Sequence, residues 1–235
     1  MKRQKKADIL YMDQDIIVCR KPQGMPVQND KSRDLSLYND LKNEISKKEK
    51  QVPELFVVHR LDRPVGGVMV FARTKEAAAN LSAQIQKGIF EKYYQAVLTG
   101  DLPDDQGVLT DYLKKDAKTN TSKVVPEGTK GGKKAELEYE VLDVIETDQG
   151  VYTYALIHLL TGRHHQIRVQ CANAGAGIWG DTKYNPKFRN TKRRYVQIGL
   201  YATRISFQHP STGKKLVFKV EADGEAFDLL DAEEC

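Results

Sequence analysis

The chain has 235 residues, 40% of them hydrophobic, a content typical of a globular protein with a sizeable core rather than of a disordered chain. Its 37 Lys and Arg residues exceed its 32 Asp and Glu residues, and the net charge of +5 agrees with a nucleic-acid partner without requiring one. No apolar run is long enough to span a bilayer, and the charged opening lacks the apolar core of a secretion signal, so we expect a cytoplasmic protein.

Apolar runs and helical spacing alternate in the first part of the chain. A short β-branched run at residues 16–19 predicts a strand. Leu37, Leu41 and Ile45 are four residues apart, a spacing that predicts a helix. The apolar run at 55–58 has β-branched members and no alternation, which predicts a strand covered on both faces.

An acidic residue follows this strand on a tight loop. Residues 59–67 read His-Arg-Leu-Asp-Arg-Pro-Val-Gly-Gly and place Asp62 between the run at 55–58 and a second apolar run at 68–72. Pro64 fixes its own φ and the two glycines permit positive φ, so the segment predicts a turn between two strands. A carboxylate held there is poised to act as a nucleophile or a charge partner. The alternative is a surface hairpin whose charged side chains are merely solvated.

A helix and a strand come next. Ala77, Leu81 and Ile85 have helical spacing ahead of Gly88, a residue type common just after a helix end. Residues 93–98 predict a strand. Alternation puts its two tyrosines on opposite faces, so only one of them can line a pocket, and the alternative for either is plain core packing.

The following stretch is basic and rich in strands. Residues 119–132, with one proline and three glycines, predict a hairpin region between strands, and further strands are predicted at 135–145 and 151–159. Seven lysines and two acidic residues lie between positions 114 and 134. Such a run is most often a solvated face. Together with the basic opening and the basic cluster at 187–194, it could also track a phosphate backbone, with an affinity that falls as salt rises.

A predicted helix opens the last part of the chain. Thr161 is expected as its N-cap and residues from Arg163 onward as its body, with Ile167 on the buried face. A helix start that carries free amides and an arginine favours phosphate. Strands are predicted at 197–207 and 216–220. Many strands, few helices and no regular βαβ alternation predict an antiparallel or mixed α+β domain.

Several short segments occur in a distinctive order. They are Lys21-Pro22-Gln23-Gly24, the loop 59–67, Lys92-Tyr93-Tyr94, residues 161–169, Gly180-Asp181-Thr182-Lys183-Tyr184 and the stretch 200–219. Together they resemble the signatures of the RluA-type family of RNA pseudouridine synthases. The resemblance implies a single domain with a long curved mixed, mostly antiparallel sheet, flanked by a few helices, with the catalytic cleft across the sheet.

The resemblance also implies a reaction. The N1–C1′ glycosidic bond of a uridine breaks, the uracil rotates and it rejoins the sugar through C5, so no atoms enter or leave and no cofactor or metal is needed. By resemblance, Asp62 is the nucleophile, at either the sugar C1′ or C6 of the base. Arg168 is then the ion-pair partner that keeps this carboxylate charged. Tyr94 stacks on the uracil and takes part in proton movement at C5.

Further residues are expected to contact RNA: Arg60, Arg63, Lys92, Arg163 and His165. Arg60 is expected to fill or steady the space that an extruded base leaves, because a guanidinium both stacks and forms hydrogen bonds. The alternative is that it only pins the loop. His165 is expected to be structural or to contact RNA rather than to catalyse.

The expected organisation is a basic tail at 1–8, a catalytic domain at 9–223 and an acidic tail at 224–235, without a separate N-terminal RNA-binding domain. We expect a monomer that acts on structured RNA, ribosomal or transfer, with no membrane partner. The three cysteines are odd in number and too scattered for a zinc knuckle, which predicts reduced thiols.

Two alternative functions remain. A non-catalytic RNA-binding protein with the same fold would not need the trio Asp62, Tyr94 and Arg168. An RNA N-glycosidase or nuclease would need a second catalytic carboxylate, a histidine pair or a metal cluster, and the sequence lets us assign none of these.

Overall fold

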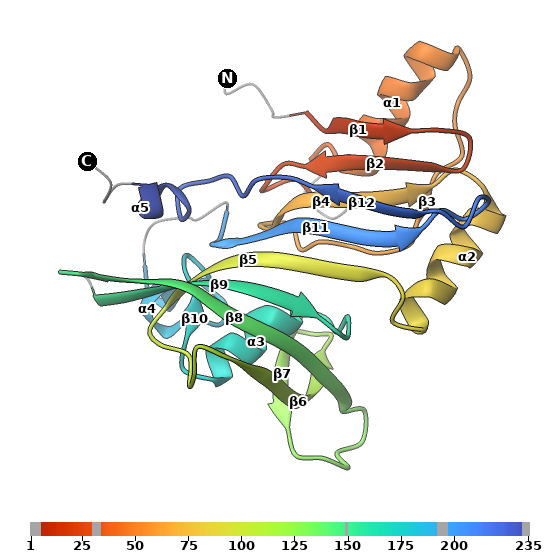
Figure 1. Ribbon diagram of the computed structural model, residues 1–235. Coiled ribbons are helices and arrows are strands. Elements are labelled where there is room, and N and C mark those ends of the chain that lie inside the picture. The colour runs from red at the N-terminus through yellow and green to blue at the C-terminus, as the bar shows by residue number, and fades with distance from the viewer. Residues whose placement is uncertain (1–5, 30–33, 149, 192–196, 232–235) are drawn as a thin grey trace. The chain divides into compact units, whose positions relative to one another are not determined.

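The structure is a computed structural model that describes residues 6–29, 34–148, 150–191 and 197–231 (Figure 1). They belong to two compact units, bounded by residues 1–91 with 202–222 and by residues 92–201 with 223–235. Much of the predicted basic opening (1–5), part of the basic cluster (192–194) and the end of the acidic tail (232–235) lie outside the described residues.

The first unit is built on a mixed sheet. Its strands are β1 (Asp8–Met12), β2 (Ile16–Lys21), β3 (Phe56–Val57), β4 (Gly66–Ala72), β11 (Leu200–Gln208, of which the first two residues belong to the second unit) and β12 (Lys215–Lys219). The order is β1-β2-β4-β11, with β3 paired to β4 and β12 to β11. The β1–β2, β2–β4, β3–β4 and β11–β12 ladders are antiparallel. β4 and β11 point the same way in Figure 1, which makes the sheet mixed.

Two helices complete this unit: α1 (Leu37–Glu49) and α2 (Lys75–Gln86). Each begins at a side-chain cap, since the hydroxyl of Ser36 accepts the N–H of Asn39 and the hydroxyl of Thr74 accepts the N–H of Ala77. The apolar face of α2 packs on the sheet in one core with β2, β4 and β11. All seven residues of β4 are buried, as expected for a strand covered on both faces.

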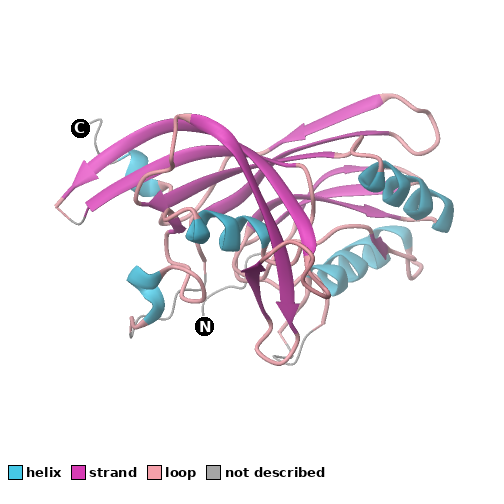
Figure 2. Ribbon diagram, turned by 90° about the horizontal axis from the view of Figure 1, so that it is seen from below, coloured by secondary structure: helices cyan, strands magenta, loops and turns pink. Residues whose placement is uncertain are grey.

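The second unit contains the longest strands. They are β5 (Glu91–Thr99, of which the first residue belongs to the first unit), β6 (Gln106–Asp116), β7 (Thr121–Val125), β8 (Lys133–Thr147), β9 (Gly150–Leu159) and β10 (Gly177–Ile178), and the helices are α3 (Gln166–Asn173), α4 (Pro186–Arg189) and α5 (Asp228–Asp231). The order is β5-β9-β8-β6-β7 with β10 paired to β5, and every ladder is antiparallel. Figure 2 shows β8 and β9 curving over α3. Val169 of α3 packs against Leu113 of β6 and Ala135 of β8, which fixes the helix under the curved strands.

The predicted α+β class, with a mixed, mostly antiparallel sheet and few helices, is confirmed. Two details were wrong. The apolar run at 55–58 forms only the two-residue strand β3, and both of its residues are half-buried, because it pairs with no more than the last two residues of β4. The stretch 119–132, predicted to lie between strands, itself contains β7. The sequence patterns also missed β1 and β6.

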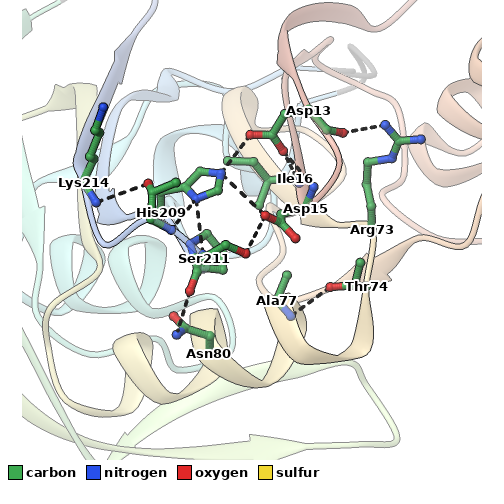
Figure 3. Close-up of polar contacts among 12 residues, drawn as sticks. Asp13, Asp15, Ile16, Arg73, Thr74, Ala77, Asn80, His209, Ser211 and Lys214 are labelled. Atoms are coloured by element: carbon green, nitrogen blue, oxygen red, sulfur yellow. Dashed lines mark hydrogen bonds and ion pairs between the residues drawn. The ribbon is translucent and has the colours of Figure 1, made fainter.

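A polar cluster ties two turns of the first unit together (Figure 3). The ring Nε2 of His209, after β11, lies 2.8 Å from Asp13 Oδ2, and the hydroxyl of Ser211 donates to Asp15 Oδ2 at 2.6 Å. The other ring nitrogen of His209 accepts backbone N–H groups of Ser211 and Thr212. It therefore carries no proton, and Nε2 is the donor toward Asp13.

Candidate active site

Asp62 lies on the loop that joins β3 to β4 in the first unit. The N–H of Val65 donates to the carbonyl of Asp62 at 3.0 Å, which closes the turn, and the Asp62 side chain is half-buried. Gly67 has a φ of +124° and approaches the backbone of Ala202 in β11 so closely that a side chain would overlap it. The predicted turn between two strands is confirmed, and glycine is required at its end.

Arg63 fastens this loop to the segment that follows β2. Its Nε donates to the carbonyl of Gly24 at 3.0 Å, and the N–H of Gly24 donates back to the carbonyl of Arg63 at 2.9 Å. The guanidinium also forms an ion pair with Asp34. Arg63 therefore stabilises the loop, whereas the side chain of Arg60 is exposed on the same loop.

A buried lysine, for which the sequence indicated no separate role, lies close to Asp62. Lys21 is 0% exposed, and its Nζ donates to the carbonyls of Met25 (2.7 Å), Pro22 (3.0 Å) and Arg63 (3.2 Å). Three carbonyl acceptors match the three N–H groups of an ammonium. Burial lowers the pKa of Lys21 from 10.5 to about 7, and the charge of Asp62 opposes this shift. A protonated Lys21 in turn favours the ionised form of Asp62.

Tyr94 and Lys92 lie on one face of β5 in the second unit. Tyr94 is 6% exposed and Lys92 is 8% exposed, and alternation turns Tyr93 to the other face, where its ring stacks on His158 at 4.3 Å. The predicted opposition of the two tyrosines is thus confirmed. Burial lowers the pKa of Lys92. A Cβ on Gly162 would lie 3.6 Å from its Nζ, so this ammonium lies beside the turn that precedes α3.

The helix after this turn begins later than predicted. α3 starts at Gln166, and its N-cap is His165, which has a left-handed φ of 55° and forms no side-chain cap. Thr161 is not the N-cap, because its hydroxyl donates to Gln166 Oε1 at 2.8 Å, and the same oxygen accepts the N–H of Arg163 at 2.9 Å. Arg163 lies in the turn, exposed, with its Nε donating to the carbonyl of Lys134 at 2.8 Å.

Arg168 is buried on α3 and paired with a carboxylate, Asp181, to which the sequence alone assigned no role. Its Nε and Nη2 donate to the two oxygens of Asp181 at 2.7 and 2.8 Å. Asp181 is 1% exposed and Arg168 is 5% exposed. The guanidinium carbon also lies 5.1 Å from the ring centroid of Tyr184. Both partners of Arg168 come from the Gly180–Tyr184 segment, which is one of the segments that carry the family resemblance. The resemblance therefore indicated this segment but not its contacts with Arg168.

His165 belongs to an aromatic and hydrogen-bonded cluster. Its Nδ1 lies 2.6 Å from the hydroxyl of Tyr184, which also accepts the N–H of Ser122 at 2.8 Å. Its ring stacks on that of His164 at 3.7 Å, and Ser122 Oγ lies 2.9 Å from His164 Nδ1. These contacts join His165 to Tyr184 and His164 within the second unit.

The predicted residues thus fall into two groups. Asp62, Arg60 and Arg63 belong to the first unit, where Lys21 joins them. Tyr94, Lys92, Arg163, His165 and Arg168 belong to the second unit, where they lie on β5, in the turn before α3 and on α3. The first group offers a half-buried carboxylate with a buried lysine close to it. The second offers a buried phenol, a buried ammonium and a rigidly held guanidinium.

Among the described residues, one cluster has the composition of a metal site: Asp13, Asp15 and His209. The residues do not favour a metal, because His209 Nε2 is protonated and donates to Asp13, and Asp13 Oδ1 accepts the N–H groups of Asp15 and Ile16 at 2.8 and 2.9 Å. We interpret the cluster as a structural clasp. Within the described part of the chain, no helix is both long and apolar enough to cross a membrane.

The comparison with protein families identifies one family. The family described as RNA pseudouridylate synthase matches residues 15–173, more than half of the chain. The chain belongs to this family. The resemblance to the RluA type is confirmed by its relatives among synthases of that type, and the matched range contains Asp62, Tyr94 and Arg168.

Curated members of this family align with nearly the whole length of the chain. The ribosomal large subunit pseudouridine synthase D of Neisseria meningitidis is 32% identical over 95% of the chain, and the chain spans only 60% of that relative. The tRNA pseudouridine synthase C of Vibrio parahaemolyticus is 30% identical over 92% of the chain and 90% of the relative.

Solved structures show the same fold. Human RNA Pseudouridylate Synthase Domain Containing 1 has a TM-score of 0.75 at 20% identity, over 99% of this chain and 97% of that one. Human RNA Pseudouridylate Synthase Domain Containing 4 has a TM-score of 0.74 at 21% identity, over 92% and 88%. At this identity the likeness concerns the fold alone.

Proposed function

We propose that the protein is an RNA pseudouridine synthase, an isomerase that converts a uridine of structured RNA into pseudouridine. The observation that carries the proposal is the family match over residues 15–173, which includes an acidic, a phenolic and a guanidinium group at the positions expected for this chemistry. A protein that only bound RNA would not need these three groups.

Asp62 is the nucleophile in this proposal. Attack at the sugar C1′ forms a C–O bond as the N1–C1′ pair of electrons leaves with the uracil. Attack at C6 instead bonds the carboxylate to the base, and the N1–C1′ bond then breaks with its pair of electrons going to the uracil. In either case the uracil rotates, C5 bonds to C1′ and the carboxylate is regenerated. A half-buried carboxylate on a closed turn suits this role, because it has few orientations to lose.

A nucleophilic carboxylate has to stay ionised, and two cations serve this purpose. Lys21 interacts with Asp62 within the first unit, so its charge lowers the cost of ionising the carboxylate. Arg168 is the second cation, as the family resemblance implies. It is held by Asp181 through its Nε and Nη2, and a guanidinium carries five N–H donors in all.

Tyr94 supplies the surface for the uracil. Its buried ring can stack on the base, and its hydroxyl can take part in removing the C5 proton after the new bond forms. Water is the competing reactant, because it would hydrolyse the intermediate, and the burial of Tyr94 and Lys92 supports a site from which water is largely excluded.

The same proposal assigns RNA contacts. Lys92 is a buried ammonium beside a glycine turn, which suits a phosphate of the target nucleotide, and Arg163 is exposed in that turn. The target base has to leave its stack. Arg60, which is exposed and close to Asp62 in sequence, is the residue that we assign to the vacated space. His165 and Arg63 would support these contacts through the loops that they hold.

Substrate class follows from the relatives. One acts by name on the ribosomal large subunit and another on tRNA. We therefore infer that the substrate is ribosomal or transfer RNA. We also infer that the protein acts in the cytoplasm as a monomer. The isomerisation balances without a redox cofactor, nucleotide or metal.

A direct test uses total RNA from cells that lack the protein. Purified wild-type protein and Asp62→Asn are incubated with this RNA, and pseudouridine is mapped at single-nucleotide resolution. Asp8→Asn is the matched control, because it removes an exposed carboxylate of the first unit whose ion pair with Arg20 is exposed on both sides. We expect new pseudouridine with the wild type and with Asp8→Asn, and none with Asp62→Asn at unchanged RNA affinity.

The outcomes separate the alternatives. A wild-type protein that binds RNA but forms no pseudouridine in it would favour the non-catalytic binding protein. Release of free uracil with abasic sites would favour an N-glycosidase. Pseudouridine formation by Asp62→Asn at the wild-type rate would overturn the assignment of the nucleophile.

A further inference from the structure

Asp181 is fixed in place by its own segment of the chain. It follows β10, its N–H donates to the carbonyl of Ile178 at 3.2 Å, and its carbonyl accepts the N–H of Asn185 at 3.0 Å. Its Oδ1 accepts the N–H groups of Lys183 at 3.0 Å and Tyr184 at 3.4 Å. The carboxylate is therefore oriented by backbone groups as well as by its charged partner.

The ion pair that it forms with Arg168 has the geometry of a positioning contact. Two parallel bonds, from Nε and Nη2, fix the plane of the guanidinium as well as its distance. Both side chains are buried, so breaking the pair would leave an uncompensated charge in a dry environment. The guanidinium therefore has little freedom to turn.

A second contact holds the face of the same guanidinium. The ring of Tyr184 lies under it, and the hydroxyl of this ring is anchored by Ser122 and His165. The edge and the face of the Arg168 guanidinium are therefore both held by residues of the segment that follows β10. A cation that acted only as a point charge would not need such restraint, and its pairing with a carboxylate would weaken its field.

We propose that Asp181 is a positioning residue for the reaction, which holds the guanidinium of Arg168 in the orientation that catalysis requires. The inference rests on the proposed function. The variant Asp181→Asn distinguishes a role of Arg168 through its orientation from a role through its charge, because it removes a negative charge beside Arg168. A point-charge role for Arg168 would leave the rate equal or higher in this variant, and a positioning role for Asp181 lowers it.

The test is a double-mutant cycle in the full-length protein. Single-turnover rates of pseudouridine formation and RNA dissociation constants are measured for the wild type, Asp181→Asn, Arg168→Ala and the double variant. We expect Asp181→Asn to lower the rate by about 10- to 100-fold with little change in RNA affinity. If Asp181 acts only through Arg168, the double variant is no slower than Arg168→Ala.

Glu49→Gln is the matched control. The Arg73–Glu49 pair is partly buried, with Nη2 of the arginine donating to both carboxylate oxygens at 2.6 and 2.7 Å, and it lies among residues with no assigned role in the site. This variant is expected to lose some stability and to keep its rate. Asp181→Glu retains the charge but displaces the carboxylate by one methylene, and it replaces Asp181→Asn if that variant does not fold. It is expected to be slow as well.

The inference is overturned if the active wild-type enzyme and the folded Asp181 variant have rates within about twofold of one another, or if the loss caused by Asp181→Asn persists in the Arg168→Ala background. Those outcomes leave the proposed function intact. A wild-type protein that forms no pseudouridine in any RNA overturns both.

Discussion

Gly67→Ala is expected to be strongly destabilising, because the strand after the Asp62 loop has no room for a side chain. A Cβ at this position would lie 2.2 Å from the carbonyl oxygen, 2.6 Å from the nitrogen and 2.7 Å from the carbonyl carbon of Ala202. These are backbone atoms of β11 and cannot rotate away, so β4 and β11 would have to separate.

The size of the effect follows from two contributions. A φ of +124° costs a non-glycine residue about 1 to 3 kcal/mol. Loss of packing between two adjacent strands brings the expected total to about 4 kcal/mol or more. This is a large share of the roughly 5 to 15 kcal/mol by which a typical domain is stable.

Gly88→Ala is the matched control for the glycine substitution. Gly88 also has positive φ, +71°, but a Cβ there meets nothing within 4 Å, so only the backbone cost of about 1 to 2 kcal/mol is expected. Urea unfolding followed by circular dichroism gives both free energies. Equal losses for the two variants would refute the reasoning that the close approach of β11 requires glycine at position 67.

Three further predictions concern charge. Since the unfolded chain keeps a proton on Lys21 up to about pH 10 and the folded chain loses it near pH 7, the free energy of unfolding should rise with pH by up to about 1.4 kcal/mol per unit. Urea titrations between pH 7 and about 8.5, below the titration of unfolded cysteine thiols, should show this rise for the wild type and not for Lys21→Met. Identical slopes of unfolding free energy against pH in the two proteins would contradict the prediction. Lys92→Met should reduce the slope of log affinity for RNA against log salt by about 0.7 to 0.9, whereas exposed Lys219→Met should not; an unchanged slope would argue against a phosphate contact. Hydrogen bonds lower the pKa of Asp13 although its partial burial acts to raise it, so its contribution to stability is present above the unfolded pKa and lost as pH falls through the folded one. Asp13→Asn should therefore make acid unfolding shallower below about pH 4, and an unaltered acid transition would exclude this role.

Patterns in short stretches of the sequence predicted those helices and turns whose conformation depends mainly on residues near one another in the chain. The spacing of apolar residues identified α1 and α2, with Gly88 at the end of α2. The proline and the two glycines within residues 59–67 identified the loop of Asp62. β6 escaped notice because its eleven residues are largely polar and only one of them, Leu113, is buried. Its pairing with β7 and β8 decides its conformation, and such pairing is not a local property of the sequence.

The site was predicted less completely, for a similar reason. The sequence resemblance indicated Asp62, Tyr94 and Arg168, but the contacts of Lys21 and Asp181 depend on burial and on residues brought together by the fold. A lysine is seldom fully buried, so no pattern predicts that Lys21 is 0% exposed. Thr161 was misassigned as an N-cap because its hydroxyl donates to the side chain of Gln166 and accepts the N–H of Glu136 in β8, rather than an N–H of the first turn of α3.

The most direct test of the central claim is made in cells. Pseudouridines are mapped across all RNA in cells that lack the protein and in the same cells supplied with wild-type protein, Asp62→Asn or Asp8→Asn. We expect that at least one ribosomal or transfer RNA position loses pseudouridine in the deletion, regains it with the wild type and with Asp8→Asn, and stays uridine with Asp62→Asn. An unchanged map in the deletion, or restoration by Asp62→Asn, would contradict the account.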